Sequence, residues 1–417
     1  MSPYRANLTR VVAARFLSRA GSEAAFFIGM WGKAAFELQA SATELAFVMF
    51  ALSVSLIVGS AAGGVLVDRF GPRNVLIYSH VAFVPAALAI VLADSIPRLV
   101  ALAGVWGLVA APILTAGASF APFLTTRDDQ LKRANALIEG AGSAAFIAGP
   151  ALGAIIARYA SIDLVFYVDA AASVVAAIII WGVSLAPHER SATSERPLAE
   201  LTRGLRITYA LPSVRFYVLV GTAVWLGFGV FGALEPLFFR DVVGTGVEMI
   251  GWMNSLVGLG FVAGALAFDR FPGTSVSARA LTISVAAIGM GSVVYVLTPR
   301  VPVIALGAVA IGTAAGVFAP LQRTLIHRDT PREFLGRVIG ASEVHHRGGE
   351  LLPLAFAPIL AATFGVQPTL IAGGLVMVVI AVAALRAAAR LDRALPPRPV
   401  TLEPASVTTD EPISPNP

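Results

Sequence analysis

The sequence of 417 residues contains no cysteine and little charge. Without a thiol, the chain can form neither disulfide bonds nor cysteine-ligated metal or redox centres. Charged residues make up 13% of the chain, whereas soluble domains carry about 25%. Hydrophobic residues make up 57%, and the mean hydropathy is +0.80. This composition excludes an ordinary soluble domain and is typical of a protein embedded in a lipid bilayer.

Apolar runs of about 20 residues or more recur along most of the chain. A helix of that length crosses the roughly 30 Å hydrocarbon core, and lipid requires every backbone polar group to be bonded internally. Transmembrane β-strands would instead show alternating runs of about 10 residues. We therefore predict an all-α polytopic membrane protein with twelve transmembrane helices. The predicted spans are 9–32, 44–66, 75–93, 97–123, 135–157, 163–186, 214–238, 247–268, 277–297, 301–325, 337–364 and 367–389.

Lysine and arginine are distributed unevenly between the two sides of these spans. Of 30 basic residues, 20 fall on the side that carries both termini, five on the other side and five within spans. The positive-inside rule therefore predicts cytoplasmic termini and a location in the plasma (inner) membrane. The bases are spread over short loops, so the sequence pI near 9.9 does not predict nucleic-acid binding.

The triplet Asp-Arg-Phe occurs at 68–70 and again at 269–271, each time after an apolar run. The pair Arg-Asp at 127–128 recurs at 328–329 with the same offset of 201 residues. These landmarks predict a duplication of six spans, giving parallel repeats about an axis normal to the membrane. The predicted domains are an N-terminal six-helix half at 1–186, a cytoplasmic linker at 187–213, a C-terminal six-helix half at 214–390 and a disordered cytoplasmic tail at 391–417.

The stretch GVLVDRFGPR at 64–73 lies in the loop between the second and third spans. It resembles the signature of the major facilitator superfamily. The matching residues are Gly64, Asp68, Arg69, Gly71 and Arg73, and the weaker copy keeps Asp269 and Arg270. The resemblance implies a transporter fold with two six-helix halves, in which this loop is a latch that locks their cytoplasmic faces when the cavity opens outward. A solvated turn that serves only as a topology signal is the alternative interpretation.

A second resemblance lies in the fifth span, AFIAGPALGA at 145–154. Gly149, Pro150 and Gly153 match the glycine-proline motif of exporters in this superfamily, although alanines stand at 145 and 154 where glycines are expected. A membrane-helix proline frees a backbone carbonyl, and small residues allow close helix contact, so we expect a bend and a tight interdomain contact here. The pattern is most similar to twelve-span drug, macrolide and siderophore exporters.

Ionisable residues inside spans cost roughly 2.5 to 3.5 kcal/mol each at the bilayer centre, so they should face the protein interior or a wet cavity. In the first span, Arg15, Arg19 and Glu23 recur at intervals of four and form one polar stripe. The family places an acidic residue on this span, which makes Glu23 with Arg19 the leading proton-coupling candidate. The others are Glu343, Arg347 and Glu350 in the eleventh span and Glu139 in the fifth. The alternative is an ion ladder that stabilises packing, and we expect Asp169 in the sixth span to be structural.

The family resemblance implies that the first, fourth, seventh and tenth spans line a substrate cavity. Aromatic and apolar walls suit a large amphipathic compound, cations included, better than a sugar. The substrate-binding candidates on these spans are Phe26, Phe27, Trp31, Trp106, Trp225, Phe228, Phe231 and Glu235.

The sequence contains no Walker loop, no Cys/His metal cluster and no G-x-S-x-G elbow. We therefore predict no enzyme, no catalytic or metal-ligating residue and no cofactor. The prediction is a monomeric secondary active transporter whose partners are a small-molecule substrate, protons and the lipid bilayer. It would export amphipathic drug-like compounds by proton-coupled alternating access. The alternatives are a dedicated exporter of a self-made metabolite or siderophore, and a lipid flippase or non-transporting membrane sensor.

Overall fold

The computed structural model describes residues 3–185, 197–270, 272 and 275–394. Parts of the predicted linker (187–196) and tail (395–417) lie outside the described residues. The N-terminal elements are α1 (Pro3–Ala24), η1 (Ala25–Met30), η2 (Gly32–Glu37), α2 (Ala42–Val91), α3 (Ile96–Ala118), η3 (Ala121–Phe123), α4 (Asp128–Tyr159) and α5 (Ile162–Trp181). The C-terminal elements are α6 (Pro197–Ala210), α7 (Pro212–Leu237), η4 (Phe238–Val243), α8 (Glu248–Asp269), α9 (Ala278–Val296), α10 (Val301–Asp329), η6 (Arg332–Phe334), α11 (Leu335–Phe364) and α12 (Val366–Ala394).

Helix α2 contains two of the predicted spans. A straight helix of 50 residues would be about 75 Å long, more than twice the thickness of the hydrocarbon core. At Gly71 the backbone leaves the helical region, with φ 77° and ψ 154°. A residue with a Cβ rarely adopts a positive φ of this kind, so glycine is required where the chain turns from the second span to the third.

Within the described residues, nine helices are long and apolar enough to cross a membrane. Helices α1 and α11 are not among them, and they are the two helices that carry the charged stripes identified in the sequence. With α2 counted as two spans, these helices make up the predicted twelve. Helix α6 is additional and lies in the C-terminal part of the predicted linker. The described residues contain no strand, so the all-helical prediction is confirmed.

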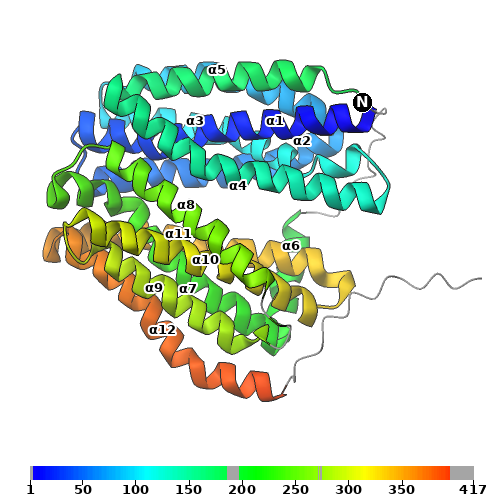
Figure 1. Cartoon of the computed structure of the whole chain (residues 1–417), viewed down its shortest axis with the longest axis vertical. Helices are drawn as coiled ribbons and strands as arrows, with labels where there is room; N and C mark the ends of the chain where they lie inside the picture. Colours follow the sequence, from blue (N-terminus) through cyan, green and yellow to red (C-terminus); the bar gives the residue numbers. More distant parts are fainter. Residues whose placement is uncertain (1–2, 186–196, 271, 273–274, 395–417) are drawn as a thin grey trace, which may run out of the picture.

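The two groups of spans pack in the same way. Figure 1 shows α1–α5 in its upper part and α7–α12 in its lower part, with both described chain ends toward the right. Helix α1 packs on α4 and α5, and its counterpart α7 packs on α11 and α12. Helix α2, which contains the second and third spans, packs on α3 and α5. Its counterparts in the other half are α8 and α9. Both pack on α10, and α9 also packs on α12. This equivalence supports the duplication that the repeated triplets predict.

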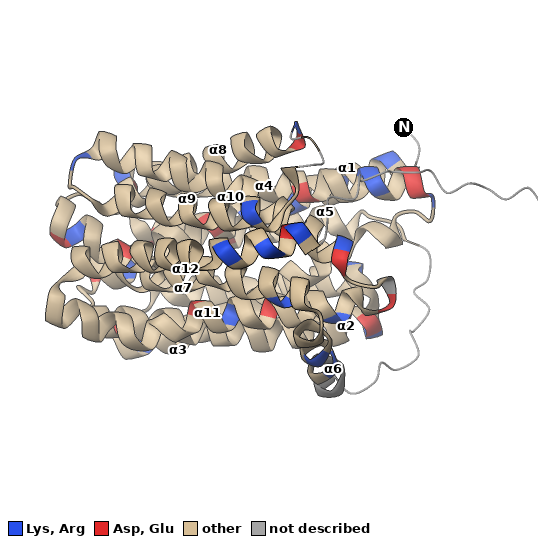
Figure 2. Ribbon diagram, turned by 90° about the horizontal axis from the view of Figure 1, so that it is seen from below, with Lys and Arg blue, Asp and Glu red and all other residues tan. Residues whose placement is uncertain are grey.

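Charged residues are sparse along the helices. In Figure 2 most of the ribbon is free of charge, and the charged residues gather toward helix ends and loops, with more on the side that carries the N-terminus. Large apolar side chains such as Trp181, Ile178 and Leu306 are exposed on the outer surface. An apolar exterior is what a lipid-facing bundle requires.

Candidate functional site

The two halves are in close contact at the end of the molecule opposite the chain termini. Arg240, at the end of the seventh span, donates from Nη1 to the carbonyl oxygens of Ala35 (2.6 Å) and Ala40 (3.1 Å) in the other half. A cation beside carbonyls at a helix C-terminus is favourable because those groups have no intrahelical donor. Arg158 of α4 also lies 3.8 Å from Glu248 of α8. We call this end the closed end.

The glycine-proline segment of α4 forms part of the contact between the halves. A Cβ on Gly251 of α8 would lie 2.8 Å from Ala154 Cβ, and the Gly251 backbone also packs against the Pro150 carbonyl. One turn further along α8, Ser255 donates to the Ile147 carbonyl at 2.9 Å. Helices α4 and α8 therefore touch through backbone atoms, as small residues at a helix interface permit.

The two glycines of the motif, Gly149 and Gly153, face the first span rather than the opposite half. A Cβ on Gly149 would lie 2.6 Å from Ala20 O and 2.6 Å from Glu23 Cβ. A Cβ on Gly153 would lie 2.8 Å from Ile28 Cγ1. The two motif glycines thus hold α4 against α1 directly behind Glu23, while Pro150, like Ala154 and Ile147 of the same segment, contacts the other half.

The latch sequence lies at the opposite end of the molecule. Asp68 and Arg69 are exposed, and the Arg69 guanidinium lies 5.2 Å from the centre of the Phe70 ring. Arg73 donates from Nη2 to the Trp181 carbonyl at 2.7 Å, which ties the loop to the end of α5. In the second copy, Asp269 and Arg270 are exposed as well.

Several glycines near this end face open space. Among the described residues, a Cβ on Gly64 of α2 would meet no atom within 4 Å, and the same holds for Gly336 and Gly340 at the start of α11. These positions contrast with Gly251 at the closed end, where a Cβ would meet the Pro150 carbonyl and the Ala154 side chain of the other half.

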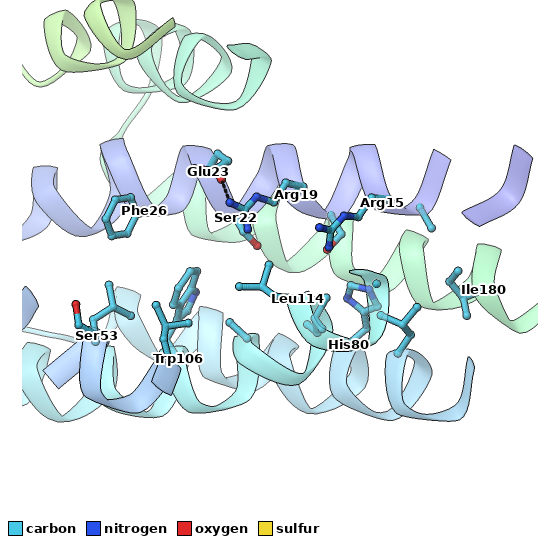
Figure 3. A pocket seen from close by; sticks show the side chains of 18 of the residues that line it. Arg15, Arg19, Ser22, Glu23, Phe26, Ser53, His80, Trp106, Leu114 and Ile180 are labelled. Carbon is cyan, nitrogen blue, oxygen red and sulfur yellow. Dashed lines mark ion pairs between the residues drawn. The ribbon is translucent and has the colours of Figure 1, made fainter. Parts of the chain in front are cut away.

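A cavity of about 190 Å³ lies between α1, α2, α3, α5 and α11. In Figure 3, Arg15, Ser22 and Phe26 of α1 project toward the facing helices, from which Ser53, His80 and Trp106 point back, and Arg19 runs along α1 to its ion pair with Glu23. Of the residues predicted from the sequence, the cavity is lined by Arg19, Glu23, Phe26, Trp106, Arg347 and Glu350. The structure therefore brings together the charged residues of the first and eleventh spans.

Both carboxylates of this cavity are paired within their own helix. Arg19 Nη2 lies 2.5 Å from Glu23 Oε1, and Arg347 Nη1 lies 2.9 Å from Glu350 Oε2. Arg15 also lines the cavity, and its buried Nε has no hydrogen-bond partner among the described residues. Three arginines and two glutamates give these walls a formal charge of 3 − 2 = +1. Because neither carboxylate is free, the described residues that line the cavity offer no unpaired anion to a cationic substrate in this conformation.

A second cavity of about 340 Å³ lies within the C-terminal half and is lined by α7, α8, α10 and α11. It contains Trp225, whose ring stacks on His346 with centroids 5.4 Å apart, and Glu343. The structure thus divides the predicted stripe of α11, because Glu343 faces this cavity whereas Arg347 and Glu350 face the first.

The remaining aromatic candidates lie around these cavities or inside a half. Phe27 and Trp31 pack edge-to-face at 5.3 Å beside Phe26, and Phe228 packs against Trp225 at 6.3 Å. Phe231 packs against Tyr295 inside the C-terminal half.

Two acidic candidates lie outside both cavities. Tyr295 donates from its hydroxyl to Glu235 Oε1 at 2.7 Å, so this buried carboxyl group belongs to the packing of the C-terminal half. Glu139 is exposed on α4 and lines neither cavity.

The sequence reading missed two basic residues at the closed end. Lys33 is buried, 4% exposed, and pairs with Asp163 at 2.7 Å and with Glu37 at 3.3 Å. The spacing of Lys33 and Glu37 by four residues could have predicted their ion pair, because residues four apart lie on the same face of a helix. Arg240 also pairs with its sequence neighbour Asp241, but no local pattern indicated its contact with the other half, because that contact is with backbone carbonyls about 200 residues away.

A sequence model described as the Major Facilitator Superfamily matches residues 11–342 and also residues 217–414. The chain belongs to this superfamily. The multidrug efflux pump Tap of Mycolicibacterium fortuitum is 25% identical over 358 residues, covering 83% of this chain and 87% of the pump. The enterobactin exporter EntS of Shigella boydii is 24% identical over 348 residues, covering 81% of this chain and 82% of the exporter.

Solved structures of other transporters share the fold. A variant of the nucleoside transporter NupG superposes with a TM-score of 0.72 at 12% identity, covering 91% of this chain and 99% of that one. A bacterial homologue of the human lysosomal transporter Spinster, in an inward-facing and unoccupied conformation, gives a TM-score of 0.69 at 14% identity over 94% of this chain and 98% of that one. These likenesses support the twelve-helix transporter fold.

Proposed function

We propose that this protein is a secondary active transporter that exports amphipathic drug-like compounds, driven by protons that enter the cell. The observation that carries the proposal is the cavity at the junction of α1 and α11, where mostly apolar walls with Phe26 and Trp106 surround the Arg19–Glu23 and Arg347–Glu350 pairs. Ionisable pairs at membrane depth are typical of proton and substrate pathways. The relatives named as a multidrug efflux pump and an enterobactin exporter support export as the direction.

The proposal includes the position of the chain in the membrane. Both termini lie in the cytoplasm, and the two halves, 1–186 and 214–390, are joined by a cytoplasmic linker. The closed end then faces outward, and the end with Gly64, Gly336 and Gly340 faces the cytoplasm. In this arrangement the structure corresponds to an inward-facing state, ready to receive substrate from the cell.

Accumulation assays in an efflux-deficient host test the proposed function. Cells that express the protein should accumulate less of at least one dye or antibiotic from a panel than cells with an empty vector, and a protonophore should abolish the difference. The same panel includes siderophores, because one relative is named as an enterobactin exporter. Export of siderophores alone would favour the dedicated exporter, and equal accumulation of every compound would contradict export.

Single cysteines placed in this cysteine-free chain test the orientation. Ser95 and Lys132 are both exposed, on opposite sides of the proposed membrane. In intact cells, we expect a membrane-impermeant maleimide to label Ser95→Cys and to leave Lys132→Cys unlabelled until the membrane is opened. Labelling of both from the same side would overturn the orientation.

The latch is tested by Asp68→Asn. Because Asp68 is exposed at a span end, the variant should insert and fold normally. A carboxylate near a helix N-terminus contributes about 0.3 to 1 kcal/mol, so its loss should reduce the outward-open population and the export rate by about two- to fivefold. Export by purified protein in vesicles measures this effect. An unchanged rate would show that the loop is only a turn.

A further inference from the structure

Asp169 of α5 is a carboxyl group enclosed by protein. Its side chain is 0% exposed, and it sits one hydrogen bond behind the wall of the first cavity. Ser22, which lines that cavity, donates to Asp169 Oδ1 at 3.2 Å. The helices approach closely here because residue 21 is a glycine, where a Cβ would lie 2.9 Å from Asp169 Oδ1.

The second oxygen of this carboxyl group is unsatisfied. Asp169 Oδ2 is buried and has no hydrogen-bond partner among the described residues. The ionisable groups of the nearby cavity wall are Glu23, which pairs with Arg19, His80, whose Nδ1 lies 3.4 Å from Ser173 Oγ, and Arg15, whose buried Nε has no partner in the described part of the chain. Among the described residues, none of these groups forms an ion pair or hydrogen bond with Asp169. An ionised carboxylate buried without a cation and with one hydrogen bond is strongly unfavourable, so this arrangement suits the neutral acid.

A second buried polar group without a hydrogen-bond partner among the described residues, the indole N–H of Trp106, lies beside Asp169. The Trp106 indole interacts with the Asp169 side chain, yet its buried Nε1 donates no hydrogen bond within the described part of the chain. Trp106 also lines the first cavity, and its ring packs edge-to-face on Phe83 at 5.4 Å. The indole N–H is therefore a donor without an acceptor, and Asp169 Oδ2 is an acceptor without a donor, among the described residues. A donor to the anionic form would stabilise the carboxylate.

We propose that Asp169 is a proton-carrying carboxyl group of this transporter and that Trp106 couples its protonation to occupancy of the cavity. A substrate that packs on the indole turns Nε1 toward Asp169 Oδ2. For the proton to leave, the hydrogen bond between the two groups first reverses, so that the Asp169 O–H donates to Ser22 Oγ and the Ser22 hydroxyl donates to water in the cavity. The Asp169 proton then passes to Ser22 Oγ as the Ser22 hydroxyl proton passes to that water. The carboxylate then accepts hydrogen bonds from Ser22 and Trp106. This inference rests on the proposed proton-coupled export, and it assigns a role to the carboxyl group that the sequence reading considered structural.

Infrared spectroscopy of the purified protein tests the protonation state without any substrate. The carbonyl-stretch band of a protonated carboxyl group should be present in the unmodified protein and lose one component in Asp169→Asn. Ser22→Ala should shift that component, because it removes the hydrogen bond to Oδ1. Asparagine preserves the shape of the side chain and can still accept from Ser22, so a merely structural role would leave folding and activity intact in this variant.

Matched variants identify the component. Glu23→Gln should leave the band unchanged, because Glu23 is an ion-paired carboxylate in this state. Asp94→Asn, on an exposed loop, should also leave it unchanged. An identical band in Asp169→Asn and the unmodified protein would overturn the proposal.

Trp106→Phe tests the coupling. It keeps an aromatic ring against Phe83 but removes the N–H. As the pH is raised, the Asp169 component of the band should disappear about one to two pH units later than in the unmodified protein, because the anion loses a donor. An unchanged midpoint would remove Trp106 from the mechanism.

If the unmodified protein in vesicles exports a dye without moving protons, the proton coupling of the proposed function fails, whereas the infrared result addresses Asp169 alone.

Discussion

Replacing Gly251 by leucine is expected to prevent the two halves from closing at the closed end. A Cβ at this position would already lie 2.8 Å from Ala154 Cβ and 2.9 Å from Ile28 Cδ1. A larger side chain has no space between these backbones, and overpacking of this kind costs about 1 to 3 kcal/mol. The equilibrium between inward-facing and outward-facing states should therefore shift toward outward-facing by about five- to 150-fold.

Accessibility of a cysteine at the closed end measures this shift. Val247→Cys is a suitable reporter, since Val247 is 5% exposed in the closed arrangement. A membrane-impermeant maleimide added outside should label this cysteine about five- to 150-fold faster in Gly251→Leu, in proportion to the expected shift of the equilibrium. Gly340→Leu is the matched control, because Gly340 faces open space at the other end and should not accelerate labelling. Equal labelling in all three proteins would show that the α4–α8 contact does not set the conformation.

Hydropathy was sufficient to predict most of the fold. Lipid allows only internally bonded backbones, so a continuous apolar run of span length has few structural outcomes. The position of the turn between the second and third spans could also be predicted from the sequence, because a glycine at position 71 can adopt the positive φ that this turn requires. The predicted linker was less informative. Its charges and prolines indicated a break between spans. Helix α6 lies within it and was not predicted, because it contains no apolar run.

The site was predictable only as far as single helices determine it. The spacing of Arg19 and Glu23 placed them on one face of a helix, and their ion pair follows directly from that spacing. Helical spacing also placed Glu343 on a stripe with Glu350, but the two residues face different cavities. Periodicity determines which residues share a face and says little about which helices that face contacts.

Asp169 and Trp106 illustrate the same limit. Each appears in the sequence as an isolated polar or aromatic residue in an apolar span, a pattern that fits a buried structural residue equally well. Their relation depends on the packing of α5 against α1 and of α3 against α2. Only the folded chain shows that Trp106 interacts with Asp169 and that Asp169 Oδ2 and Trp106 Nε1 are both buried without a hydrogen-bond partner among the described residues.

Glu23→Gln is expected to abolish uphill export. In this structure Glu23 is a buried carboxylate held by Arg19, and Gly149 allows α4 to approach directly behind it. When the cavity opens outward, a proton that binds Glu23 would release Arg19 and travel inward with the carrier. Glutamine has the same shape but carries no proton, so this step is lost while the substrate cavity is retained.

The size of the effect follows from the energy that proton entry supplies. One net charge that moves inward through 100 mV contributes about 2.3 kcal/mol, which sustains a concentration ratio of about 50. In vesicles with an imposed potential, Glu23→Gln should lose this ratio and approach unity, while downhill exchange of the same compound continues. Glu350→Gln is the matched control, because Glu350 lines the same cavity and pairs with its own arginine, Arg347. Proton-driven accumulation that persists in Glu23→Gln and disappears in Glu350→Gln would move the coupling role from α1 to α11.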